Sequence, residues 1–392
     1  MTTHTKALLY LKPTYELVVS KVLFSLGYGV AIIGIPLYLV QHGLHASGVG
    51  IFTGLISLLT VITSLYLPPI LEEYNQQKLL IISSFVAGVS FILFFLSPAA
   101  PIAIVFLAVG QISLYINSNA FSVLFKDSTR GIEEFTKNTG LLGSLTNLGW
   151  FVGPLLGGLA LKAFGFKGLF ILAGVFVMLG GLYVLIFPFK ATTKRRARFD
   201  TQILNNLKFF FSNTQLRIAY LQGLGIDFWW SFVWTFIPIF MLRRGYSGSS
   251  IGIYIALTQL PLFLFEFKTV VFVEKLGYKR IFTAAYMSLA LMCFLSFFYF
   301  TSNLTIVLGL ILLGSLALSF LEPISELFFF SKVSLTEEEK GCPIYTTSSP
   351  LGSMMSKILP GLILIVLPDS AVFVFIGLVT GFIGYRALAI TD

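Results

Sequence analysis

Long apolar stretches follow one another along most of this chain, and they constrain its fold more than any other feature. A helix that crosses a lipid bilayer needs about 20 predominantly apolar residues. Hydrophobic residues make up 56% of the 392 residues and charged residues only 11%, whereas soluble domains contain about 45–50% and about 25%. The sequence therefore predicts an all-α membrane protein and excludes a secreted domain, a cytosolic enzyme and a nucleic-acid-binding protein. The twelve predicted transmembrane helices are residues 17–40, 46–70, 79–97, 101–125, 138–164, 166–188, 214–242, 249–273, 279–300, 303–330, 343–366 and 369–390.

Basic residues are concentrated in the loops on one side of the predicted membrane. The longest polar break, residues 189–213, carries six Lys and Arg residues. The loops expected on the other side hold only Lys162, Lys167, Arg243 and Arg244. Because cytoplasmic loops retain Lys and Arg, we expect a multi-pass protein of the inner or plasma membrane with both termini in the cytoplasm. This topology accounts for the net charge of +9 without any nucleic-acid partner.

The basic break also divides the chain into two parts of similar length. We expect a first six-helix bundle over residues 1–188, a basic cytoplasmic linker over 189–213 and a second six-helix bundle over 214–392. The two bundles resemble each other at a constant offset of 202 residues. Chance similarity between apolar helices is the alternative explanation, but Pro, Gly and loop charges match as well as Leu and Ile. The matched pairs are Pro36 with Pro238, Gly43 with Gly245, Ser47 with Ser249, Gly50 with Gly252, Glu72 with Glu274 and Lys78 with Arg280.

Two further patterns lie at fixed spacing. The loops that follow the second and eighth predicted helices combine an acid with bases, and glycines recur along the fifth predicted helix around one proline. Glycines at such intervals let a neighbouring helix approach closely, and a proline allows a kink. The loop residues are Glu72, Lys78, Glu274, Lys275, Gly277, Lys279 and Arg280. The fifth-helix residues are Gly140, Gly149, Gly153, Pro154, Gly157 and Gly158.

These patterns resemble the major facilitator superfamily over essentially the whole chain. The loops are similar to its G-x-x-x-D-R-x-G-R-R signature, although the first copy departs from it at Pro68, Glu73 and Asn75. The resemblance implies a fold of two pseudo-symmetric six-helix bundles and a charge latch at the cytoplasmic side. The alternative is that the basic residues of these loops serve only to set the orientation of the helices in the membrane.

The fifth-helix pattern matches the antiporter signature of that family, G-x8-G-x3-G-P-x2-G-G. Within the family this signature is commonest in the twelve-helix proton-coupled exporters of drugs and other amphipaths, so it implies export. The alternative is that the motif only allows close helix packing and does not indicate the direction of transport. The sequence departs from the drug-exporter pattern because residues 101–125 contain no arginine and residues 17–40 no central acid.

The charged residues that lie deep within the predicted spans all fall in the second bundle. Each such charge costs roughly 2.5–3.5 kcal/mol on insertion scales. Family architecture implies that several of them share one polar cluster around a central cavity. We expect Asp227 and Glu322 to carry protons and Lys357 to compete with the proton or the substrate; a structural ion pair is the alternative. The charged candidates are Asp227, Glu266, Glu322, Glu326 and Lys357, with Lys268 near a helix end.

Aromatic and amide side chains on the helices implied to line the cavity are candidates for substrate contact. Trp230 and Trp234 lie four residues apart, so they share one helical face. Stacked rings suit a flat or cationic amphipath, whereas a lipid-facing aromatic belt is the alternative. The cavity candidates are Tyr28, Tyr38, Tyr115, Asn117, Asn119, Trp230 and Trp234.

The sequence thus predicts a secondary active transporter that exports a small organic or amphipathic compound against proton uptake by alternating access. It contains no G-x-x-x-x-G-K-[ST] motif and no catalytic constellation, so we expect no ATP-driven step, no enzymatic activity, no metal and no cofactor, with an ion gradient as the driving force. A functional monomer in the lipid bilayer is expected. The alternatives are an uptake symporter, a lipid or glycolipid flippase, and a transporter-like scaffold or sensor.

Overall fold

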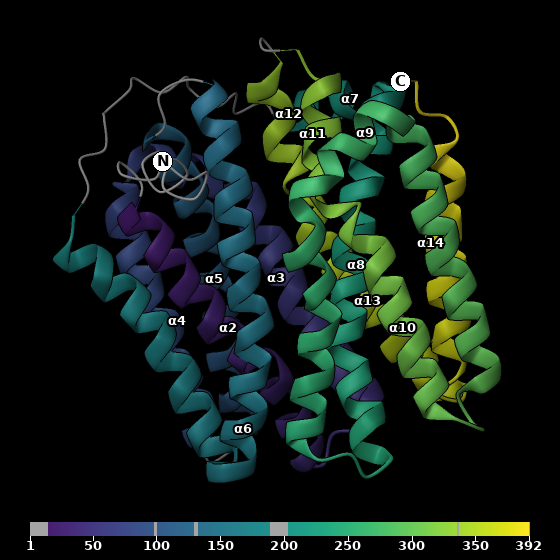
Figure 1. Cartoon of the computed structure of the whole chain (residues 1–392). Helices are drawn as coiled ribbons and strands as arrows, with labels where there is room; N and C mark the ends of the chain where they lie inside the picture. Colours follow the sequence, from purple (N-terminus) through teal and green to yellow (C-terminus); the bar gives the residue numbers. More distant parts are fainter. Residues whose placement is uncertain (1–14, 98–99, 129–131, 189–202, 335–336, 392) are drawn as a thin grey trace, which may run out of the picture. The chain divides into compact units, whose positions relative to one another are not determined.

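The computed structural model describes residues 15–97, 100–128, 132–188, 203–334 and 337–391. Within these ranges the chain consists of helices joined by short turns and contains no strand (Figure 1). The predicted all-α membrane fold is confirmed. The helices are α2 (Tyr15–Gln41), α3 (Ala46–Glu73), α4 (Gln76–Leu96), α5 (Ala100–Ser128), α6 (Ile132–Ile186), α7 (Ile203–Ser212), α8 (Thr214–Arg243), α9 (Gly248–Tyr299), α10 (Leu304–Ser319), α11 (Glu322–Lys332), α12 (Glu338–Tyr345), α13 (Ser348–Val366) and α14 (Ala371–Ala387).

Ten helical segments of the described chain are long and apolar enough to cross a membrane. One of them, within α6, has 45 residues, which at about 1.5 Å per residue is enough for two crossings. α6 and α9 each contain a sharp break, at Gly165 with a φ of 64° and at Gly277 with a φ of 75°. Only glycine adopts this left-handed conformation without strain. The breaks separate the fifth from the sixth and the eighth from the ninth predicted helices.

Two stretches that the sequence predicted as single helices are each divided in two. Residues 303–330 form α10 and α11, and residues 343–366 include the end of α12 and all of α13. A proline clashes with the carbonyl group four residues before it. Pro323 lies four residues after Ser319, the last residue of α10, and Pro350 lies four residues after Thr346, which caps the end of α12. The prolines therefore account for both interruptions.

The internal repeat has a structural counterpart at the ends of α2 and α8. Gly43 and Gly245, which the offset of 202 residues pairs, have φ angles of 89° and 82°. The amide of Gly43 donates a hydrogen bond of 3.0 Å to the Val40 carbonyl, and that of Gly245 one of 2.9 Å to the Leu242 carbonyl. The same left-handed turn thus follows the first helix of each copy.

The helices form two compact units, each with its own packing. In the first unit α4 packs against α5 and α6. In the second unit α8 is the central helix, because it contacts α7, α10, α11, α12, α13 and α14. The units combine the described residues of Met1–Tyr38, Pro69–Arg196 and Tyr246–Gln259 (first) and of Leu39–Pro68, Ala197–Gly245 and Leu260–Asp392 (second). The boundary predicted at 189–213 stays a prediction: 189–202 lie outside the described residues, and the rest contains α7.

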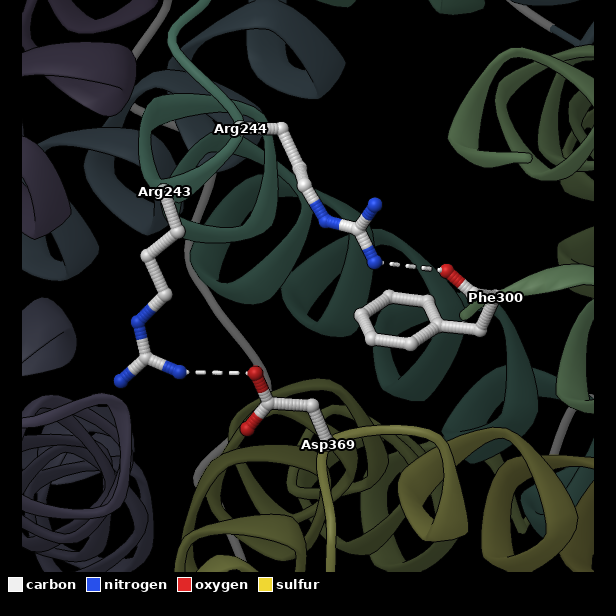
Figure 2. A network of polar contacts seen from close by, with 4 residues as sticks. All are labelled: Arg243, Arg244, Phe300 and Asp369. Carbon is white, nitrogen blue, oxygen red and sulfur yellow. Dashed lines mark hydrogen bonds and ion pairs between the residues drawn. The ribbon is translucent and has the colours of Figure 1, made fainter. Parts of the chain in front are cut away.

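Two arginines at the end of α8, the last helical residue Arg243 and the cap Arg244, have local partners in the second unit (Figure 2). Arg243 forms an ion pair of 2.7 Å with Asp369, between α13 and α14. Arg244 donates a hydrogen bond of 3.0 Å to the Phe300 carbonyl, and its guanidinium lies 5.9 Å from the centre of the Phe300 ring. These contacts explain two of the few basic residues on the side predicted to be external.

Candidate functional site

An acid and a base interact between α8 and α13 in the second unit. The carboxylate of Asp227 on α8 accepts a hydrogen bond from the Ser349 hydroxyl on α13, and its charge interacts with that of Lys357 on the same helix. Gly352 permits the close approach of the two helices here, because a Cβ atom at this position would collide with the carbonyl oxygen of Leu224. Each charge offsets part of the cost of placing the other within a membrane span.

Serine hydroxyl groups extend this pair to a third helix, α3. The Lys357 ammonium donates a hydrogen bond of 3.1 Å to Ser57 Oγ on α3. The Ser57 and Ser353 hydroxyls lie 3.2 Å apart, and Ser231 on α8 donates to Ser353 at 2.9 Å. We call this set the charged cluster: Asp227, Lys357, Ser57, Ser231, Ser349 and Ser353.

Sequence reasoning missed these serines, because a serine in a transmembrane helix most often bonds to its own backbone. Ser57 indeed also donates to the Thr53 carbonyl at 3.1 Å. The available signal was the spacing of Ser349, Ser353 and Lys357 at intervals of four residues, which places all three on one face of a helix.

Glu322, the second predicted proton carrier, lies at the start of α11 and contacts a tryptophan. The indole nitrogen of Trp230 donates a hydrogen bond of 3.1 Å to Glu322 Oε2. The Trp230 ring stacks on Trp234, with centroids 5.5 Å apart and an angle of 18° between the planes. Glu322 and Glu326 are exposed, whereas Trp230 is buried. The structure therefore links Glu322 to an aromatic pair and Asp227 to a lysine.

The tyrosines of α2 have different surroundings in the first unit. Tyr28 donates a hydrogen bond of 3.1 Å to Gln111 Oε1 on α5, and its ring meets the edge of Trp150 with centroids 5.1 Å apart. Tyr38 is only 5% exposed, and its hydroxyl group donates to the Phe95 carbonyl at 3.3 Å. The rings packed around it are Phe94, Phe95, Phe166 and Phe170. Tyr28 lies in a polar setting and Tyr38 in an aromatic core.

The amide candidates of α5 also differ in their contacts. Asn117 is 3% exposed and donates hydrogen bonds to the hydroxyl groups of Ser83 and Ser84 on α4, at 3.2 and 2.8 Å. Asn119 is half-buried and donates to the Tyr115 carbonyl on its own helix at 2.9 Å. Asn117 therefore joins α4 to α5, while Tyr115 and Asn119 share a less buried face.

The two signature-like loops use different residues at matched positions. Asn75, at the place where the family signature has a glycine, caps α4 by accepting a hydrogen bond from the Lys78 amide. The matched residue of the second copy, Gly277, provides the left-handed break in α9. Lys78, Lys275 and Arg280 are exposed, and Lys279 is half-buried. Four predicted site residues lie outside the part of the chain whose side chains are described: Glu72, Gly140, Glu266 and Glu274.

The glycines of the fifth-helix motif bring α6 into contact with α2 within the first unit. A Cβ atom at Gly149 would lie 2.8 Å from Ser25 Cβ, and one at Gly153 would lie 2.8 Å from the Cα atom of Gly29. A Cβ atom at Gly157 would lie 2.8 Å from the Val30 carbonyl oxygen. Three glycines at intervals of four residues thus form one continuous seam along α2.

Pro154 and Gly158 of the motif contact the start of α9, in the same unit. A Cβ atom at Gly158 would lie 2.9 Å from the Gly248 carbonyl oxygen and 3.1 Å from the Gly252 Cα atom. In the second unit, α3 crosses α13 in a similar way: a Cβ atom at Gly50 would lie 2.7 Å from the Lys357 carbonyl oxygen and 3.1 Å from the Gly361 Cα atom. The first crossing contains the motif, and the second adjoins the charged cluster.

Apolar helices long enough to span a bilayer, charges held within the spans and close glycine crossings define a class: polytopic membrane transporters. The comparisons with known proteins agree. The model of the Major Facilitator Superfamily matches residues 17–325, so the chain belongs to this family and is a secondary transporter, not an enzyme.

Solved structures give the same fold. A mutant of the nucleoside transporter NupG has a TM-score of 0.78 at 11% sequence identity, and the match covers 96% of this chain and 99% of the other. A second structure of the nucleoside transporter NupG has a TM-score of 0.76 at 12% identity, with 96% and 98% covered. Comparison with curated protein sequences gives no match. At these identities the likeness concerns the fold alone.

Proposed function

We propose that this transporter exports a small organic or amphipathic compound in exchange for protons, by alternating access. It acts as a monomer in the inner or plasma membrane, with both termini in the cytoplasm, and an ion gradient drives it without a cofactor. Asp227 and Glu322 are the proposed proton carriers. The observation that carries the proposal is the interaction of Asp227 with Lys357 inside the membrane-spanning part of the second unit.

The chemistry of the charged cluster supports proton coupling. Burial favours the neutral form of a carboxyl group, whereas a nearby ammonium favours its charged form. When Asp227 takes up a proton, Lys357 loses a charged partner on α8 and keeps the Ser57 hydroxyl on α3. Protonation therefore changes the balance of contacts between helices, which is what a coupling site in an alternating-access transporter requires.

The glycine seams support the export direction through the family resemblance. The fifth-helix motif is commonest in exporters, and here its glycines occupy tight crossings with α2 and α9. A crossing without side chains leaves no room for water or solute between the two helices. Such a seam limits leakage of protons while the transporter changes state.

The test is proton movement in liposomes that contain the purified protein and an internal pH-sensitive dye. We would add one compound from each class: tetraphenylphosphonium as a cationic amphipath, benzoate as an anionic one and uridine as a nucleoside. At least one of these classes should move protons in the opposite direction to the compound. Asp227→Asn and Glu322→Gln should abolish that movement, whereas the matched control Asp369→Asn, which changes an acid in a turn, should retain it.

Several results would contradict the proposal. Full proton movement in both Asp227→Asn and Glu322→Gln would show that these two residues do not carry the protons. Protons and compound moving in the same direction would favour the uptake symporter. Movement of a fluorescent phospholipid between leaflets, with no dependence on pH, would favour the flippase. No transport of any compound by well-folded protein would favour the scaffold or sensor.

A further inference from the structure

The first unit contains a lysine within a membrane span that lies against aromatic rings. Lys21 belongs to the apolar segment Leu17–Gln41 of α2. Its ammonium donates a hydrogen bond of 2.9 Å to Ser118 Oγ on α5. It also lies over the rings of Phe24 and Phe121, at 4.9 and 5.0 Å from their centroids. The side chain is therefore directed to the neighbouring helix rather than along α2 towards its end.

No acidic side chain compensates this charge among those that the structure describes. Within that part of the chain the one ion pair is Arg243–Asp369, whereas the charge of Lys357 interacts with that of Asp227. Lys21 and Lys357 thus differ: Lys357 has an acid across the helix interface, and Lys21 has a hydroxyl group and two rings.

The contacts of Lys21 offset the cost of its charge but do not neutralise it. A lysine within a span costs roughly 2.5–3.5 kcal/mol, and each cation–π contact returns about 0.5–2 kcal/mol. An ammonium group has three donors, and one of them bonds to Ser118. The other two donors of the ammonium group have no acceptor among the described residues.

We propose that Lys21 and Ser118 bind the anionic group, a carboxylate or a phosphate, of a compound with an apolar or aromatic body. Lys21 is half-buried and so keeps part of its surface accessible. Phe24 and Phe121 provide apolar walls beside the ammonium. This inference rests on the proposed transport function and deepens it by naming the substrate class. An anionic lipid headgroup offers the same chemistry, so the experiment must separate a free compound from a lipid.

The experiment measures thermal unfolding of the full-length protein in nanodiscs of phosphatidylcholine, which contain no anionic headgroup. The ligands are benzoate and phenyl phosphate, with neutral benzamide as the matched control of the same shape. Both anions should raise the unfolding midpoint of the wild type, and benzamide should not. Lys21→Gln should weaken the apparent affinity for the anions by about tenfold or more. Lys21→Arg should retain most of it, and Lys162→Gln, which removes an exposed lysine of the same unit, should retain all of it.

A second variant, Ser118→Ala, tests the proposal if Lys21→Gln does not fold. It removes the hydrogen bond to the ammonium group and leaves the charge of Lys21 in place. Where both variants fold, Ser118→Ala should weaken anion binding less than Lys21→Gln does. Equal stabilisation by benzamide and benzoate would overturn the proposal, and so would an unchanged benzoate response in Lys21→Gln or, where that variant does not fold, in Ser118→Ala. A Lys21-dependent rise in the midpoint on adding phosphatidylglycerol, without a response to the free anions, would identify the lipid headgroup as the ligand. No response to either source would overturn the anion site.

The outcome is separable from that of the proton-coupling test. Loss of anion selectivity with Asp227-dependent proton movement intact would overturn the Lys21 site alone. Anion binding with no dependence of proton movement on Asp227 would overturn the coupling site alone.

Discussion

Replacing Gly252 by alanine tests how tightly α9 crosses α6. A Cβ atom at Gly252 would lie 2.5 Å from the Pro154 carbonyl oxygen, 2.8 Å from the Gly158 Cα atom and 3.1 Å from the Gly158 nitrogen. All three are backbone atoms, which cannot rotate away as a side chain can. Favourable contacts between carbon atoms lie at about 3.5–4.0 Å, so the two helices would have to separate by about 1 Å.

Two opposing terms set the expected size of the effect. Overpacking a tight site costs about 1–3 kcal/mol, and the higher helix propensity of alanine returns about 1 kcal/mol. Gly252→Ala should therefore lower the free energy of unfolding by up to about 2 kcal/mol. The matched control is Gly309→Ala in α10, where no atom lies within 4 Å of the new Cβ. There only the propensity term remains, so that variant should gain about 0.5–1 kcal/mol.

The measurement is unfolding by sodium dodecyl sulfate in mixed micelles, followed by tryptophan fluorescence. The two variants should differ by about 1–3 kcal/mol, which corresponds to roughly a fivefold to 150-fold difference in the unfolding equilibrium constant. If Gly252→Ala is as stable as Gly309→Ala, the helices do not meet at this glycine and the reasoning from the crossing fails.

Three further variants probe single contacts by the same unfolding assay. Asn117→Leu should cost about 1–3 kcal/mol because it removes the hydrogen bonds to α4, whereas Asn119→Leu should cost less; equal losses would contradict this assignment. Lys357→Met should cost about 0.5–3 kcal/mol because it removes the charge that interacts with Asp227, and adding Asp227→Asn should recover much of the loss. Losses that simply add would show that the two side chains do not interact. Arg243→Ala should cost less than about 1 kcal/mol because its ion pair with Asp369 is partly exposed, and the loss should shrink as salt is added. A larger loss, or one that salt does not change, would show that this ion pair is not exposed to solvent.

The fold could be predicted from the sequence because two of its determinants are local. Apolar runs of the length of a membrane locate the helices, and the glycines at 165 and 277 end them where a left-handed conformation is needed. The interruptions before Pro323 and Pro350 follow from the same local rule for proline. Sequence reasoning missed them because a long apolar pattern conceals a break that leaves hydropathy unchanged.

The site was less predictable, because its contacts join residues far apart in the chain. Asp227 and Lys357 stood out as charges within spans, yet the link from Lys357 to Ser57 crosses 300 residues. A serine in a transmembrane helix has no sequence signal that distinguishes a partner for another helix from a bond to its own backbone. Lys21 lies near the start of its predicted span, residues 17–40, and this position alone does not give the direction of its side chain. Its direction depends on Ser118 and on two rings that only the packed structure brings together.

The two glycine crossings explain how one repeated framework holds different chemistry in its two copies. Gly252 approaches the carbonyl oxygen of Pro154, and Gly50, its match at the offset of 202, approaches the carbonyl oxygen of Lys357. In both crossings the contact is made by a backbone carbonyl group, so the geometry does not depend on the side chain at that position. In the first crossing this carbonyl group belongs to a proline, which bears no charge. In the second crossing it belongs to the lysine of the charged cluster, so the backbone contact with Gly50 leaves the Lys357 side chain able to bond to Ser57 and to interact with Asp227.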